Sequence, residues 1–196
     1  IQDLLRHTSG LTYRDRGATP AHKLYPGSSV SAAVRHSEAE FLAAIAKAPL
    51  LFEPGSNWEY GFSTDLLGLV VERVTGERLG AALSRLIWTP LGMRDTSFVL
   101  SGEQSARYAH AFPTDPISGQ PVRVHHATGD VMRWDSGGGG AVSTAGDYLR
   151  FVDMLRGGGA RGGVRLLGSR TVALMTADHL PASAATRIAD SMDPAA

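Results

Sequence analysis

The sequence contains no cysteine, and lysine occurs only at positions 23 and 47, against seventeen arginines. The lack of cysteine excludes disulfides, cysteine nucleophiles and thiolate metal sites within this chain. A catalytic lysine has only these two candidates. The formal net charge is zero, which indicates neither a basic face for nucleic acid nor an acidic tail. The longest apolar run, residues 66–71, is far too short to span a bilayer.

The length and apolar content are those of one domain. With 196 residues and 43% hydrophobic content, the chain can bury a single core. We find no internal repeat and no domain linker. Capping signals, helical spacing of apolar residues and glycine stops predict helices. They are expected over residues 1–5, 37–47, 64–75 and 78–88, from Thr144 to Gly157, and from Ser169.

The remaining segments carry breakers rather than a sustained period. Residues 12–36 are predicted to form a long irregular loop, of the kind that serves as a lid or binding loop. Residues 95–126 predict short strands and turns, residues 164–167 a short strand, and residues 181–196 a loose tail rich in alanine, serine and proline. Apolar spacing predicts that two helices bury defined stripes, namely Leu66, Leu67, Val70, Val71 and Val74 in one, and Tyr148, Phe151, Val152 and Leu155 in the other.

Tyr60 lies on a short loop that leads directly into a predicted helix. Pro54-Gly55 supplies a turn before it, and Ser63 or Thr64 is placed to cap the helix after it. Short connections of this kind hold a side chain toward a cleft. Taken alone, Tyr60 could equally pack its ring in the interior.

Four segments together resemble one family in order and spacing over nearly the whole chain. Residues 4–11 (LLRHTSGL), 58–68 around Tyr60, 90–98 (PLGMRDTSF) and 137–149 (GGGGAVSTAGDYL) match its signature blocks. The chain thus resembles the serine β-lactamase-related proteins, and most of all the class C β-lactamase-like group that includes family VIII carboxylesterases. The resemblance implies an α+β, β-lactamase/transpeptidase-like fold, with residues 1–196 as the central, mainly helical part of one bacterial catalytic domain.

In that family a serine of a Ser-x-x-Lys motif is acylated, with a lysine and a tyrosine moving protons. A serine hydroxyl is a weak nucleophile until a base takes its proton, and a phenolate serves as that base when nearby positive charge stabilises it. The resemblance gives Tyr60 this catalytic role and places Trp58, Phe62, Tyr13, Gly138 and Gly139 near the substrate. It implies a small ester or amide as substrate and no metal or organic cofactor.

The sequence departs from the family pattern in two places. No Ser-x-x-Lys occurs, and no Lys/His-Thr-Gly or Trp-Gly-Gly follows Asp147. We therefore expect that the nucleophile lies outside this chain and that the chain alone is inactive. Two residues after the tyrosine, β-lactamases and D,D-peptidases usually carry asparagine, whereas this chain has Phe62. A phenyl ring cannot hydrogen-bond an amide, and the esterase branch is favoured.

Two alternatives stay open, a β-lactamase or D,D-peptidase and a non-catalytic descendant used for binding. The sequence leaves the compartment undetermined (bacterial cytoplasm, or periplasm and secretion), because the chain does not begin with methionine. It leaves the oligomeric state undetermined as well.

Other candidate residues have simpler interpretations. No Gly-x-Ser-x-Gly elbow surrounds Ser9, so His7, Thr8 and Ser9 are expected to close a helix. His125, His126 and Asp130 are not expected to bind metal, because adjacent residues of an extended segment point to opposite faces. The four glycines at 137–140 lack the Gly-Lys-Ser/Thr of a phosphate loop, and residues 156–163 predict a helix stop and turn.

Overall fold

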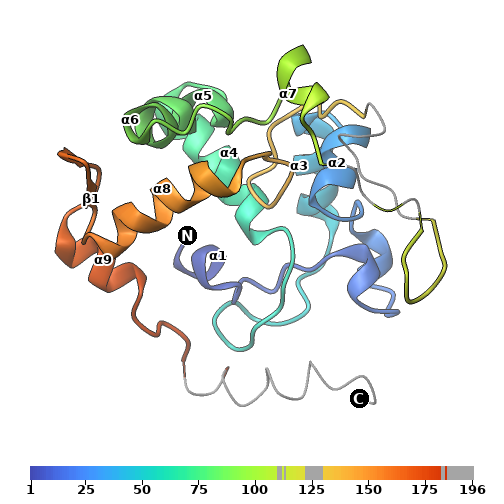
Figure 1. Ribbon diagram of the computed structural model, residues 1–196. Coiled ribbons are helices and arrows are strands. Elements are labelled where there is room, and N and C mark those ends of the chain that lie inside the picture. The colour runs from blue at the N-terminus through green and yellow to red at the C-terminus, as the bar shows by residue number, and fades with distance from the viewer. Residues whose placement is uncertain (110–111, 113, 122–129, 182–183, 185–196) are drawn as a thin grey trace.

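The computed structural model describes residues 1–109, 112, 114–121, 130–181 and 184, and within them the chain is mostly helical (Figure 1). The predicted helices form with shifts of one or two residues at their ends. The α-helices are α1 (Gln2–Arg6), α2 (Ser29–Arg35), α3 (Glu38–Lys47), α4 (Ser63–Thr75), α5 (Leu79–Leu83), α6 (Thr89–Leu91), α7 (Gly102–Ala106), α8 (Ala145–Arg156) and α9 (Ser169–Met175).

Shorter elements complete the described part. The 3-10 helices η1 (Arg14–Arg16) and η2 (His22–Leu24) precede α2, and the π-helix η3 (Ser84–Trp88) joins α5 to α6. Strands β1 (Ala160–Arg161) and β2 (Val164–Arg165) pair antiparallel, so the strand expected over 164–167 is shorter than predicted. None of the helices in the described ranges is long and apolar enough to cross a membrane.

The larger hydrophobic core lies in the N-terminal half. Aromatic rings dominate it, and they come from the segments before α2, from α3 and from the residue that precedes α4. The ring centroid of Phe62 lies 4.7 Å from that of Tyr13 and 5.2 Å from that of Phe41, and Phe41 stands 4.6 Å from Trp134. Trp134 brings the segment before the glycines into the same core. Because Phe62 of this core follows Tyr60 by two residues, the core supports the loop that carries Tyr60.

A smaller core joins η3, α6 and α8. Leu91 and Met93 pack with Met154 of α8, and Ile87, Trp88 and Phe151 surround them. Helix α4 packs against both α1 and α5 and so lies between them (Figure 1).

The expectation of an irregular loop over residues 12–36 is wrong at its C-terminal end, which forms α2. Ser28 and Ser31 make a reciprocal capping box at its N-terminus, and Ala32 and Ala33 are fully buried. Serine and alanine supply no apolar period from which the helix could be predicted, although both suit a cap and a tightly packed face.

The predicted cap and buried stripe of α4 are also wrong. Phe62 occupies the N-cap position without a side-chain cap, and Ser63 instead hydrogen-bonds Ser9, with 2.8 Å between the Oγ atoms. The fully buried positions of α4 are Ser63, Asp65, Gly68 and Leu69, whereas Val74 is 81% exposed. Apart from Leu69, the face of α4 that packs closest to the rest of the chain is therefore made of polar and small residues.

Helix α8 begins as predicted, and Phe151 and Leu155 of its expected stripe pack against the smaller core, but the rest of the stripe does not. Thr144 Oγ1 accepts the N–H of Asp147 at 3.1 Å, which caps the helix. Met154 is buried, whereas Tyr148 and Val152 of the expected stripe are exposed. Between residues 95 and 109 the structure has α7 and an isolated bridge from Ser97 to Val142 rather than strands. His125, His126 and most of the predicted tail 181–196 lie outside the described residues.

Candidate active site

Tyr60 lies at the surface, where two segments of the chain are bound together. The Glu59 N–H donates to the His7 carbonyl at 2.9 Å, and the Gly55 N–H donates to the Thr8 carbonyl at 2.7 Å. Gly61 comes so close to the other segment that a Cβ would lie 2.4 Å from Thr12 Cα. These contacts hold the loop rigidly while leaving Tyr60 itself 40% exposed.

The Tyr60 ring is held by neighbours on several sides. His7 stacks on it with ring centroids 4.9 Å apart, and Tyr13 meets it edge-on at 5.5 Å. The Arg16 guanidinium lies 5.9 Å from the ring centroid and is also bound to Glu59, with Nε and Oε1 2.7 Å apart. The ring is therefore oriented by packing although one side remains open to solvent.

His7 has a special backbone conformation. It ends α1 with φ 57° and ψ 31°, and is the only described non-glycine residue with positive φ. Its backbone N–H caps α1, so His7 closes the helix as expected, although through its main chain and not through its side chain. Burial lowers the pKa of its imidazole, which favours the neutral ring. Nothing in the sequence indicates that the same residue also supports Tyr60.

Tyr13, which the resemblance places near the substrate, is only 7% exposed. Its hydroxyl hydrogen-bonds Ser29 Oγ at 2.5 Å, and the Ser29 hydroxyl donates to Asp65 Oδ2 at 2.6 Å. Burial strongly raises the pKa of Tyr13, the bond to Ser29 offsets part of this, and the charges of Asp65 and Tyr60 add to the rise. Tyr13 therefore keeps its proton.

Asp65 is the centre of this network and is completely buried. Its other oxygen, Oδ1, accepts the Ser136 hydroxyl at 2.5 Å and the Gly138 N–H at 3.2 Å. Burial raises the pKa of Asp65, and the three donors offset part of the rise. Ser29, Asp65 and Ser136 are not among the residues predicted from the sequence, because nothing in their spacing indicates that three distant segments meet at one carboxylate.

The glycines fit this network closely. A Cβ on Gly138 would lie 2.5 Å from both Asp65 Oδ2 and Ser29 Oγ, so this position requires glycine. Gly139 lies next to Val30, and a Cβ added to it would lie 3.3 Å from Val30 Cγ2. The backbone of the glycine segment therefore approaches Asp65 and α2 closely. Whether Gly138 and Gly139 also contact substrate remains a prediction.

The two aromatic residues that flank Tyr60 differ in position. Phe62 is fully buried in the N-terminal core. Its predicted place near the substrate is thus corrected, because the ring is covered by Tyr13, Tyr25 and Phe41. Trp58 is half-buried and its ring centroid lies 6.5 Å from that of Tyr60. It lines an apolar cavity of about 560 Å³ together with Leu5, Leu174, Met175 and Leu180.

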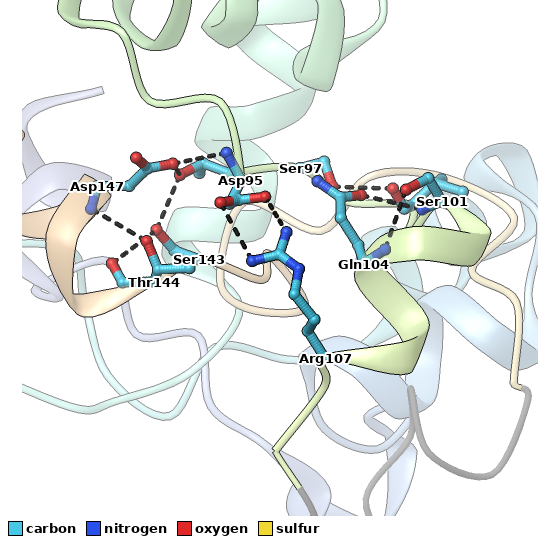
Figure 2. A network of polar contacts seen from close by, with 10 residues as sticks. Asp95, Ser97, Ser101, Gln104, Arg107, Ser143, Thr144 and Asp147 are labelled. Carbon is cyan, nitrogen blue, oxygen red and sulfur yellow. Dashed lines mark hydrogen bonds and ion pairs between the residues drawn. The ribbon is translucent and has the colours of Figure 1, made fainter.

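A second polar network holds the far end of the glycine segment (Figure 2). Asp147 Oδ2 accepts the Asp95 N–H at 2.7 Å and the Thr96 hydroxyl at 3.0 Å. Thr96 also contacts Ser143, with 2.8 Å between the hydroxyl oxygens, and Arg107 forms an ion pair with Asp95. One end of the segment 136–147 is thereby bound to the buried carboxylate of Asp65, and the other end carries the buried carboxylate of Asp147.

In the part of the chain that the structure describes, no three His, Asp or Glu side chains gather in an arrangement that could hold a metal ion. Tyr60 offers a positioned phenol with the His7 imidazole and the Arg16 guanidinium beside its ring. A phenol at an open surface can pass a proton to or from a bound molecule.

A protein-family model matches nearly the whole chain. The model named Beta-lactamase matches residues 1–191, and the chain belongs to this family. Its fold is accordingly the β-lactamase/transpeptidase-like one, and the family includes hydrolases, esterases and peptidases.

Individual relatives agree with this assignment. The chain is 36% identical to Protein Rv1367c of Mycobacterium tuberculosis over 92% of this chain and 44% of that protein. It is 35% identical to esterase EstB of Burkholderia gladioli over 80% of this chain and 44% of the esterase. Among solved structures, simvastatin synthase (LovD) from Aspergillus terreus superposes with a TM-score of 0.75, at 28% identity, over 97% of this chain and 46% of LovD. The chain thus spans about 44% of the length of these curated relatives.

Proposed function

We propose that the protein carrying this chain is a serine hydrolase that cleaves small carboxylic esters through an acyl-enzyme. Tyr60 moves the proton: it accepts it from the nucleophilic serine and returns it to the leaving alkoxide. The serine and the lysine of this chemistry lie outside residues 1–196. The observation that carries the proposal is the position of Tyr60, which is 40% exposed yet held by the rings of His7 and Tyr13.

The burial of Phe62 supports esters over amides. β-Lactamases and D,D-peptidases of this family place an amide side chain two residues after the tyrosine, where it can bond a substrate amide. Here that position holds a phenyl ring with no exposed surface, which offers a substrate neither a donor nor an acceptor. The kinship with esterase EstB points the same way.

The first prediction concerns Tyr60. In the full-length protein we expect Tyr60→Phe to lower kcat for p-nitrophenyl butyrate by about 10²–10⁴-fold, because the ring stays in place while the proton carrier is lost. The matched control is Tyr25→Phe, which removes a hydroxyl that donates to the Pro49 carbonyl inside the core. The chain of residues 1–196 alone should give no turnover.

Each alternative has its own outcome in the same assay. Faster opening of nitrocefin than of the ester would favour the β-lactamase or peptidase hypothesis. Turnover of neither substrate by the wild-type full-length protein would favour a binding protein. Near-normal ester turnover by Tyr60→Phe would remove Tyr60 from the chemistry.

A further inference from the structure

A buried chain of hydroxyls runs from Asp65 to the edge of the Tyr60 ring. It begins at a carboxylate with no exposed surface, passes through Ser29, and ends at Tyr13. Building on the proposed function of Tyr60, we infer that Tyr13 is a positioning residue for Tyr60, anchored to Asp65 through Ser29.

The direction of the hydrogen bonds follows from the number of protons. Ser29 has one hydroxyl proton and gives it to Asp65 Oδ2 at 2.6 Å. It can therefore only accept at its contact with Tyr13, and the Tyr13 hydroxyl must be the donor at 2.5 Å. The Tyr13 proton is thus committed to the interior, and this bond holds the hydroxyl end of the Tyr13 ring in place.

The two rings are in direct contact, and Tyr13 stays protonated. Burial is the main cause of the raised pKa of Tyr13, and the charge of Tyr60 adds to the rise. A phenol that stays protonated is a constant neighbour, since it does not exchange its own proton while Tyr60 works. The ring edge of Tyr13 against Tyr60, at 5.5 Å between centroids, sets the orientation.

The anchor is rigid because separate segments contribute to it. Asp65 belongs to α4, Ser29 to α2, and Ser136 and Gly138 supply the remaining two donors. Tyr13 is also wedged against Phe62, with the ring centroids 4.7 Å apart and the planes at 89°. A displacement of Tyr13 would have to break this arrangement. The position of Tyr60 therefore depends on a carboxylate that no substrate can touch.

The test uses three variants of the full-length protein with p-nitrophenyl butyrate as substrate. Tyr13→Phe keeps the ring and removes the oxygen, and Ser29→Ala cuts the link to Asp65. For both we expect kcat to fall by about tenfold or more with KM changed less than about twofold, because a misplaced proton carrier affects the reaction rather than binding. Tyr25→Phe loses a buried hydroxyl bond of the same core and should keep kcat within about twofold.

A second readout is independent of turnover. In protein labelled with ¹³C at the tyrosine Cζ, the Tyr60 signal is identified by its loss in Tyr60→Phe. We expect Tyr13→Phe and Ser29→Ala to shift this signal, and Tyr25→Phe to leave it in place. An unshifted signal and unchanged kcat in Tyr13→Phe, or an equal loss of kcat in Tyr25→Phe, would overturn the inference. A shifted signal in a protein without esterase activity would uphold the positioning role and reject the proposed function instead.

Discussion

Asp65 illustrates at the scale of one residue how costly a buried carboxylate is and how it is accommodated. An uncompensated charge would be driven out of the interior, whereas Asp65 has three donors around its two oxygens. Burial nevertheless outweighs these donors and raises its pKa. The folded state therefore binds the Asp65 proton more tightly than the unfolded state does.

This pKa shift predicts a pH dependence of stability. A carboxyl whose pKa is raised on folding stabilises the fold most below its unfolded pKa, and this contribution is lost as the pH rises through the folded value. We expect Asp65→Asn to lower the free energy of unfolding by about 1–3 kcal/mol at pH 7, because its NH₂ must face a donor. The deficit relative to wild type should widen from pH 7 to pH 4.

Urea denaturation of the wild type and of Asp65→Asn at several pH values measures their free energies of unfolding. The difference between the two free energies cancels the titration of the other groups. A deficit that narrows toward pH 4 would mean that the pKa of Asp65 is lowered by its donors rather than raised by burial.

At the scale of elements, the glycine segment and α4 cross without side chains between them. A Cβ on Gly137 would lie 2.3 Å from the Thr64 carbonyl oxygen and 3.1 Å from Gly68 Cα. Because the obstacle is backbone on both sides, no side chain can rotate away to make room. This crossing brings Ser136 and Gly138 to Asp65, and so it builds the network beneath Tyr13.

Gly137→Ala is accordingly expected to destabilise the protein by about 1–3 kcal/mol or more. Gly102→Ala is the matched control, because a Cβ at this position in the first turn of α7 meets nothing within 4 Å. It should be neutral or slightly stabilising. Thermal unfolding followed by circular dichroism compares the two, and equal melting temperatures would show that the crossing has room for a methyl group.

At the scale of the whole molecule, polar contacts between residues far apart in sequence join the two hydrophobic cores. Helix α8 carries Met154 into the smaller core, and its first turn holds Asp147, which is 6% exposed. Asp147 binds the backbone of Asp95 across 52 residues of sequence (Figure 2). The glycine segment is thereby attached to the segment of Asp95 at one end and to Asp65 at the other.

Asp147→Ala should lower the free energy of unfolding by about 1–3 kcal/mol, because the Asp95 N–H loses its acceptor. Arg107→Ala removes only an ion pair between half-exposed side chains, and its denaturation midpoint should stay close to wild type. Chemical denaturation of Asp147→Ala, Arg107→Ala and the wild type measures both losses of stability. A loss in Arg107→Ala as large as in Asp147→Ala would place the stabilising contact at the surface ion pair.

The prediction from sequence succeeded where local signals decide structure. The capping box of Ser37 and Glu40 starts α3, and Gly76 ends α4 with a left-handed backbone, both as expected. It failed where the partner lies far away in sequence. Apolar spacing predicts the leucine and valine stripe of α4 as the buried face, but Asp65 and Gly68 take that place because two glycines and two serines meet them there.

The sequence by itself determined the family, most of the helices and Tyr60 as the candidate proton carrier, because caps, turns and the spacing of signature blocks are local properties of the chain. Only the tertiary structure decided that Phe62 is core, that Tyr13 faces Ser29, and that His7 stacks on Tyr60. Burial and hydrogen-bond partners depend on which distant segments meet. For Asp65 those segments are α2 and residues 136–138, up to 73 positions away.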